Sequence, residues 1–193
     1  ADSRKLSTDD VKVLDLGGGI DIPYFGDNNI PVDFSDVHEI LMKLKIDFDL
    51  DQIWMELGRY AVGSCGHYFS QIIDRKNVRG KELLILDGGI NHIARPPLTN
   101  QFFPCQLFRE SDTNKKSFQV HGPLCTALDH LGDFDLPEDS GIGDWLVFNQ
   151  VGAYGFTEAM PFFLCHNLPA EVISYKGSFM TPRTIKTAAD WMV

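Results

Sequence analysis

The arrangement of apolar residues changes once along this 193-residue chain, and this change constrains the fold more than any other feature. Up to about residue 76, buried-strand runs alternate with a helical pattern, and residues 37–44 repeat their apolar positions at i, i+3, i+4 and i+7. Beyond about residue 81, short β-like segments are separated by turns rich in glycine, aspartate and proline. The sequence therefore predicts an α/β part followed by an all-β part.

The first part predicts two strand–helix units. Residues 12–16 (KVLDL) form a buried strand that ends at three glycines, and Ser35 is the candidate N-cap of the helix that follows. A second strand is expected over 51–55 and a second helix over 60–74. Strands that alternate with helices require a parallel sheet, yet two units cannot close a barrel, which usually takes eight. We therefore expect a segment of a larger barrel, with the N-terminal half of that barrel missing from this chain.

The second part predicts a set of short strands with turns between them. The strands are expected over residues 82–86, 117–120, 144–149 and 170–175. The expected divisions of the chain are 1–76 for the α/β part, 77–180 for the β part, and 181–193 for a surface tail or short terminal helix.

Charge and composition exclude several classes of protein. Seventeen Lys and Arg stand against 27 Asp and Glu, and the net charge of −10 argues against non-specific binding to nucleic acid or to an anionic membrane. No apolar run reaches the roughly 20 residues that span a bilayer, and the polar residues 1–10 do not form a secretory signal. The four cysteines are too widely spaced for a zinc site or a redox pair, so we expect no metal and a reduced, cytoplasmic protein.

Two short motifs follow the ends of the predicted strands of the first part. Gly17, Gly18 and Gly19 would let backbone N–H groups approach a phosphate closely. In the sequence Glu-Leu-Gly-Arg, Arg59 can pair with a phosphate and Glu56 can face a pyridine nitrogen. Taken singly, each motif has a plainer explanation, because a tight turn accounts for the glycines and a surface ion pair accounts for the charges.

Two further motifs lie in the β part. Cys125 follows a Gly-Pro turn and would present a thiol able to protonate a carbanion, although a single cysteine is more often a buried structural residue. Tyr154 lies between small residues, where its hydroxyl can bind phosphate or its ring can simply pack in the core. The order of the four motifs is more informative than any one of them.

In that order, LDLGGG, ELGRY, GPLCTALD and GDWLVFNQVGAY resemble the ornithine/diaminopimelate/arginine decarboxylase family, fold-type III enzymes that depend on pyridoxal 5'-phosphate (PLP). The resemblance extends from about Val13 to about Ser174. This family combines a TIM-type barrel that holds PLP with a C-terminal β-barrel domain, an architecture shared with alanine racemase. The resemblance therefore implies that residues 1–76 are the last βα units of the TIM-type barrel and that residues 77–180 form the β-barrel domain.

The resemblance also implies a role for each motif. The glycine loop, Gly58, Arg59 and Tyr154 match contacts to the PLP phosphate, and Glu56 matches the acid that faces the pyridine nitrogen. Cys125 matches the cysteine that reaches into the neighbouring subunit's site in a head-to-tail homodimer, where it returns a proton to Cα after CO2 departs. The lysine that anchors the cofactor as a Schiff base has no matching motif in this chain. No lysine here is assigned that role, and we expect no activity from this chain alone.

Two positions bear on the substrate. Thr126 stands where ornithine-type enzymes place an acid against the distal ammonium of the substrate, and a neutral threonine cannot pair with that group. With ELGR and GAYG, it resembles the subgroup that acts on carrier-protein-tethered or otherwise modified substrates. Arg95, in an Arg-Pro sequence similar to that of diaminopimelate enzymes, is the second candidate substrate contact. The expected reaction is decarboxylation of an amino acid or its derivative to the amine.

Three other functions stay open. A catalytically inactive, decarboxylase-like regulator would have no need of all the site residues together. A racemase shares the fold type, but the GPLC motif fits a decarboxylase better. A dimer scaffold without chemistry is the third alternative for these 193 residues taken by themselves.

Overall fold

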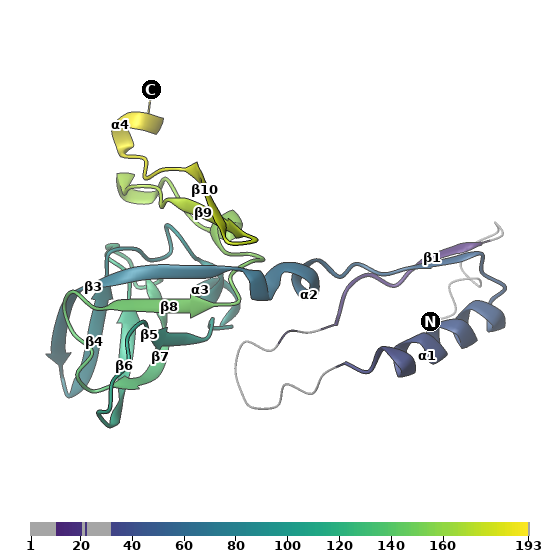
Figure 1. Cartoon of the computed structure of the whole chain (residues 1–193), viewed down its shortest axis with the longest axis horizontal. Helices are drawn as coiled ribbons and strands as arrows, with labels where there is room; N and C mark the ends of the chain where they lie inside the picture. Colours follow the sequence, from purple (N-terminus) through teal and green to yellow (C-terminus); the bar gives the residue numbers. More distant parts are fainter. Residues whose placement is uncertain (1–10, 21, 23–31, 193) are drawn as a thin grey trace. The chain divides into compact units, whose positions relative to one another are not determined.

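The structure is a computed structural model that describes residues 11–20, 22 and 32–192. The expectation that residues 1–10 do not form a secretory signal concerns residues outside this described part. The chain divides into two compact units, Ala1–Val62 and Gly63–Val193. Each unit is described by itself, and Figure 1 labels the elements of both.

The first unit contains the expected strand–helix–strand arrangement. Strand β1 (Val13–Asp15) and strand β2 (Gln52–Trp54) pair in parallel, with Leu14 opposite Ile53. Helix α1 (Phe34–Asp47) connects them. Its N-cap is Asp33 rather than the expected Ser35, because the Asp33 carboxylate accepts the Ser35 backbone N–H at 2.8 Å. The parallel pairing of the first part is confirmed.

The second helix expected over 60–74 is wrong. Only the short helix α2 (Gly58–Val62) and the 3-10 turn η2 (Gly63–Cys65) form, and strand β3 (His67–Val78) follows at once. A Cβ at Gly66 would lie 2.2 Å from the Gly152 backbone nitrogen, so the chain can pass this point only because a glycine is there. The expected division between residues 76 and 77 consequently falls within β3, while the compact units divide between Val62 and Gly63.

The second unit is built on a six-stranded sheet in the order β5-β8-β3-β4-β6-β7. All neighbouring strands are antiparallel except β4 and β6. The edge strands β5 and β7 also approach each other, so the sheet curves into a barrel-like form (Figure 1). The remaining strands are β4 (Lys81–Leu86), β5 (Cys105–Leu107), β6 (Lys115–His121), β7 (His130–Pro137) and β8 (Trp145–Asn149).

The interior of this sheet is apolar. Its fully buried side chains include Leu84, Phe118, Leu131 and Phe148, which come from four different strands. Three of the strands that carry them, β4, β6 and β8, match the segments expected over 82–86, 117–120 and 144–149. The expectation of a β-rich second part is therefore confirmed, in the form of a barrel-like sheet domain.

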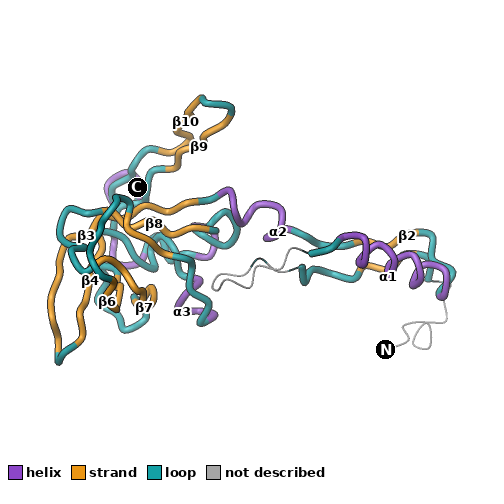
Figure 2. Tube along the Cα trace, turned by 60° about the horizontal axis from the view of Figure 1, so that its bottom comes forward, coloured by secondary structure: helices purple, strands orange, loops and turns teal. Residues whose placement is uncertain are grey.

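The rest of the second unit is a hairpin with short helical turns, as the tube in Figure 2 shows. Strand β9 (Glu171–Tyr175) matches the strand expected over 170–175 and pairs with β10 (Ser178–Arg183). The short helical elements are α3 (Arg95–Thr99), η3 (Phe156–Glu158), η4 (Phe163–Cys165) and α4 (Ala188–Trp191). The tail expected from residue 181 thus begins with the end of β10 and includes a short helix.

A cluster of hydrogen bonds around Arg109 and Asp139 connects the loops at one end of the sheet. Arg109 donates to Asp144 at 2.7 Å through Nε and to Asp139 at 2.9 Å through Nη1. The hydroxyls of Ser111 and Thr113 donate to the other oxygen of Asp139 at 2.7 and 2.8 Å. These hydrogen bonds, with the Arg109 charge, lower the pKa of Asp139 to about 2.

Lowering the pH should therefore reduce the stability of the fold, because Asp139 becomes protonated. Because the folded-state pKa is depressed, its stabilising contribution is complete above the unfolded value near 3.8 and disappears as the pH falls toward about 2. We expect Asp139→Asn to flatten the decline of the melting temperature between pH 4 and pH 2, and Ser111→Ala to flatten it partly. Thermal melts monitored by circular dichroism would test this, and a decline as steep in Asp139→Asn as in the wild type would contradict it.

Candidate functional site

The glycine loop and Glu56 meet at the carboxyl ends of the two parallel strands. The Leu16 N–H donates to the Trp54 carbonyl at 3.0 Å, and the Glu56 N–H donates to the Gly17 carbonyl at 2.8 Å. A Cβ at Gly18 would lie only 2.8 Å from the Glu56 carbonyl oxygen, so this approach requires glycine. The structure thus brings together two motifs that lie far apart in the sequence.

The backbone of this junction leaves space for a ligand. Among the residues that the structure describes, an added Cβ at Gly17, Gly19 or Gly58 would meet no atom within 4 Å. Gly17 and Gly19 have φ values of +70° and +130°, which glycine adopts without strain. Open backbone of this kind is the feature that lets N–H groups approach a phosphate. The residues present therefore fit the phosphate group of PLP.

Arg59, the charged member of the same motif, is anchored within this unit. Its Nη1 donates to the Ile22 carbonyl at 2.6 Å. Arg59 lies in α2, directly after Gly58, so the helix starts at the residue expected to contact phosphate.

Cys125 lies in the loop that joins β6 to β7, and its side chain is exposed. Thr126 stabilises the same loop, because its N–H donates to the Leu124 carbonyl at 2.8 Å and its Oγ1 accepts the Leu128 N–H at 3.2 Å. The expected proton donor, Cys125, and one of the two expected substrate contacts, Thr126, are therefore held on one short loop.

Asp129 anchors this loop from inside the protein. Its carboxylate accepts the Leu124 N–H and the Ile90 N–H, each at 2.7 Å, and only 1% of the residue is exposed. Burial raises the pKa of Asp129, against the opposing effect of these two N–H donors. Since Leu124 immediately precedes Cys125, the carboxylate fixes the backbone beside the thiol.

Two glycines make room for the Asp129 carboxylate. A Cβ at Gly89 would lie 2.0 Å from its Oδ1, and a Cβ at Gly122 would lie 2.4 Å from its Oδ2. Sequence reasoning assigned Asp129 no role. The sequence feature that could have indicated its role is its position at the end of the GPLCTALD motif, with one glycine turn before that motif and another near residue 89.

Tyr154 and Arg95 also lie together. The Arg95 guanidinium carbon is 4.3 Å from the centre of the Tyr154 ring. The same guanidinium donates from Nη1 to both carboxylate oxygens of Glu158, at 3.0 Å each. The segment after Tyr154 reaches the cysteine loop through Ile90, whose carbonyl accepts the Met160 N–H at 2.9 Å while its N–H donates to Asp129.

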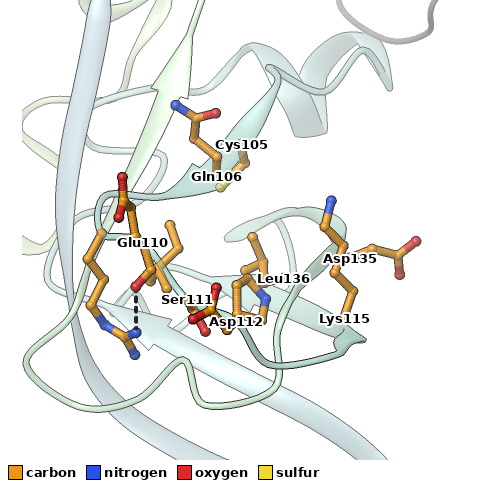
Figure 3. Close-up of a pocket in the computed structure, with 11 residues that line it drawn as sticks. Cys105, Gln106, Glu110, Ser111, Asp112, Lys115, Asp135 and Leu136 are labelled. Atoms are coloured by element: carbon orange, nitrogen blue, oxygen red, sulfur yellow. Dashed lines mark hydrogen bonds between the residues drawn. The ribbon is translucent and has the colours of Figure 1, made fainter.

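Other features of the structure lie away from these residues. A surface cavity of about 420 Å³ lies beside β5 and β7, lined by residues such as Cys105, Arg109, Lys115 and Asp135 (Figure 3), and it shares none of the predicted site residues. Within the described ranges, no three His, Cys, Asp or Glu side chains are grouped so as to hold a metal ion. No helix in the same ranges is long and apolar enough to cross a membrane.

This chain is similar to known decarboxylases. Residues 11–152 match the family model described as pyridoxal-dependent decarboxylase, C-terminal sheet domain. The chain is 34% identical over 157 residues to the diaminopimelate decarboxylase of Bacillus subtilis, a match that covers 77% of this chain and 35% of that protein. It is 27% identical over 191 residues to the L-glutamyl-[BtrI acyl-carrier protein] decarboxylase of Niallia circulans, covering 92% of this chain and 44% of that protein.

A solved structure shows the same relationship. The diaminopimelate decarboxylase of M. jannaschii, determined in complex with L-lysine, superposes with a TM-score of 0.82 and 27% identity over 93% of this chain and 42% of that one. The chain thus spans less than half the length of these relatives. On the match to the family model, which extends over more than half of its residues, this chain belongs to the pyridoxal-dependent decarboxylases, as their C-terminal sheet domain.

Proposed function

We propose that the protein containing this chain is a PLP-dependent decarboxylase that converts an amino acid or amino-acid derivative to the amine. The observation that carries the proposal is the junction of the glycine loop with Glu56. There a Cβ at Gly18 would lie 2.8 Å from the Glu56 carbonyl oxygen, while a Cβ at Gly17 or Gly19 would meet no atom of the described residues within 4 Å. In this proposal the first unit is the last βα part of a TIM-type barrel. The rest of that barrel, with the lysine that anchors the cofactor, is supplied by residues outside this chain.

The residues of this chain would hold the cofactor at both of its ends. Gly17, Gly18, Gly19, Gly58, Arg59 and Tyr154 bind the phosphate, and Glu56 faces the pyridine nitrogen. When bound, PLP withdraws electrons from the bond between Cα and the carboxylate. A carboxylate beside the pyridine nitrogen keeps that nitrogen protonated, and this makes the ring a stronger electron acceptor.

Cys125 would supply the proton that replaces CO2 on the substrate. Its exposure in the β6–β7 loop supports a role at a surface shared with a second subunit, so the proposal includes a homodimer with shared sites. A thiol held in a defined position can act as a general acid, and the backbone beside it is fixed by Asp129.

Thr126 bears on the class of substrate. A neutral hydroxyl beside the proton donor does not complement a free distal ammonium, which disfavours a simple diamino acid. One similar protein is named for a substrate carried on an acyl-carrier protein. We therefore propose a substrate whose distal end is modified or tethered to a carrier protein.

The proposal is tested by treating the full-length protein with PLP, reducing it with borohydride, and locating pyridoxyl-lysine by peptide mass spectrometry. We expect one labelled lysine, outside these 193 residues, and no specific label when this chain is treated alone. CO2 release from a panel of amino acids, free and carrier-bound, identifies the substrate. A labelled lysine without CO2 release from any of them would argue against a decarboxylase, and the lack of a specific label would favour an inactive, regulatory relative.

A further inference from the structure

Two histidines lie at the base of the cysteine loop, residues 122–129. His121 is the last residue of β6 and His130 is the first residue of β7, and the two are paired across the ladder. Their ring centres are 4.8 Å apart, and their planes are inclined by 34°. The Gly122 N–H donates to the Asp129 carbonyl at 3.0 Å, one residue further into the loop. The histidine pair, His121 and His130, therefore stacks where the two strands end and the loop begins.

A β-bulge brings the two rings together. Val120 pairs with Gly132 in the regular part of the ladder. His121 then pairs with His130 instead of Leu131, so Leu131 is an extra residue on β7. The Leu131 side chain is fully buried, whereas both histidines are partly buried. The bulge is thus the feature that places one imidazole against the other.

The charges around the histidine pair favour one added proton over two. His130 Nε2 lies 2.8 Å from Asp133 Oδ1, so a positive charge on His130 is balanced by a carboxylate. A second proton, on His121, would lie beside the His130 charge. Burial and then His130 lower the pKa of His121 below its ordinary value, with a further contribution from Lys76 of β3. Asp133 and the Asp129 backbone oppose this shift without cancelling it.

The other elements beside β6 and β7 hold their charges elsewhere. The charged residues of β4, Lys81 and Glu82, lie at the start of that strand, away from the position opposite the histidine pair. Helix α3 contacts β7, and its Arg95 is paired with Glu158. Strand β5 also approaches β7 and contains no charged residue. The mutual repulsion of two protonated imidazoles is therefore the main electrostatic effect at this position.

From this arrangement we propose that the histidine pair makes the cysteine loop sensitive to pH, holding it closed while the pair carries at most one proton and releasing it when His121 is protonated as well. The inference rests on the proposed function, in which Cys125 returns a proton to Cα. A closed loop that resists protonation of a histidine loses stability as the pH falls through the ordinary histidine value of 6.5. Proton return to Cα should therefore be accurate at neutral pH and less accurate in mild acid.

Hydrogen exchange in the full-length protein tests the loop directly. The N–H groups of Gly122, Leu124 and Thr126 are hydrogen-bonded within the loop, so their protection factors report whether it is closed. Between about pH 7.5 and about pH 5.5, these protection factors should fall about threefold or more in the wild type, after correction for intrinsic exchange. They should stay nearly constant in His121→Gln, because its amide takes up no proton. No fall in the wild type, or an equal fall in both proteins, would overturn the inference.

Two substitutions beside His121 should act in opposite directions. His130→Gln removes the charge that faces His121, so protection should fall less than in the wild type. This variant also serves if His121→Gln does not fold. Asp133→Asn removes the carboxylate that balances the histidine pair, so protection should fall more steeply than in the wild type. The reverse order of these two variants would contradict the electrostatic origin of the effect.

Two other histidines provide controls. His67 is exposed, and its Nδ1 lies 2.8 Å from Asn149 Oδ1, so His67→Gln should leave the pH dependence of the loop unchanged. His166 acts electrostatically on the Asp129 carboxylate, which also anchors the loop. A pH dependence that is lost in His166→Gln but kept in His121→Gln would assign the effect to Asp129 and overturn the inference.

The product of the reaction connects the loop to catalysis. When the proton reaches the cofactor instead of Cα, hydrolysis yields pyridoxamine phosphate and an aldehyde in place of the amine. Over the same pH range, the share of pyridoxamine phosphate should rise about twofold or more in the wild type and stay level in His121→Gln. A constant share in the wild type, although the loop loses protection, would overturn the link to proton return. If Cys125→Ala leaves the product unchanged, the role of Cys125 in the proposed function is wrong, while hydrogen exchange still decides whether the histidine pair controls the loop.

Discussion

Replacement of Cys125 by alanine in the full-length protein should lower amine formation about 10²- to 10⁴-fold, the usual contribution of a positioned general acid. The thiol is the proposed donor of the proton that replaces CO2, and alanine has no proton to give. A larger share of the turnovers that remain should end in the transamination by-product, seen as pyridoxamine phosphate and an aldehyde. Mass spectrometry of products, with CO2 measured in parallel, gives both quantities from one reaction.

Cys165 provides the control for this substitution. It is also exposed, but it lies in η4 and has no role in the proposed chemistry. Cys165→Ala should keep the rate and the product of the wild type. An unchanged rate and product in Cys125→Ala would remove Cys125 from the mechanism.

Replacement of Asp129 by alanine should cost the fold about 3 kcal/mol of unfolding free energy. The substitution leaves two buried backbone N–H groups, those of Ile90 and Leu124, without their acceptor, and each such loss costs roughly 1–3 kcal/mol. It also empties the space that Gly89 and Gly122 keep open. Urea denaturation of this chain, with the transition of the second unit followed by circular dichroism, measures the change.

Asp135→Ala is the matched control, because Asp135 lies on β7 with an exposed side chain. Its effect should stay within about 0.5 kcal/mol. Asp129→Asn should fall between the two, since its amide oxygen can still accept one of the N–H groups. A loss below about 1 kcal/mol in Asp129→Ala would mean that the loop rearranges and finds other acceptors.

The strands of the second unit could be predicted where turn residues enclose a short apolar run, as they do around β4 and β8. The segment over residues 60–74 could not, because Tyr68, Ile72 and Ile73 fit both a helical and an alternating pattern. Pairing with β4 and β8 on either side decides between the two, and that pairing is a property of the whole sheet. Gly63 and Gly66 were the local signals against a helix.

In the candidate site, too, some features could be predicted from the sequence and others could not. The junction of the glycine loop with Glu56 was predictable, because the carboxyl ends of neighbouring parallel strands share one edge of a sheet. Asp129 was not, since its carboxylate accepts hydrogen bonds from the backbone N–H groups of Ile90 and Leu124, and backbone donors leave no pattern of side chains in the sequence. The pairing of Arg95 with Glu158 joins residues from distant segments, which a single sequence does not reveal.

The glycines near the Asp129 loop also limit which chain segments can be exchanged between related proteins in a chimaera. Gly88, Gly89 and Gly122 would each bring an added methyl group within 2.4 Å of a neighbouring atom: the Tyr68 hydroxyl in the first case and the Asp129 carboxylate in the other two. Residues 122–129 and the turn at 88–90 therefore form one transferable module, although some thirty positions of sequence separate them. A chimaera that imports the cysteine loop by itself would place it on a foreign turn, and both halves must come from the same parent for the thiol to keep its place.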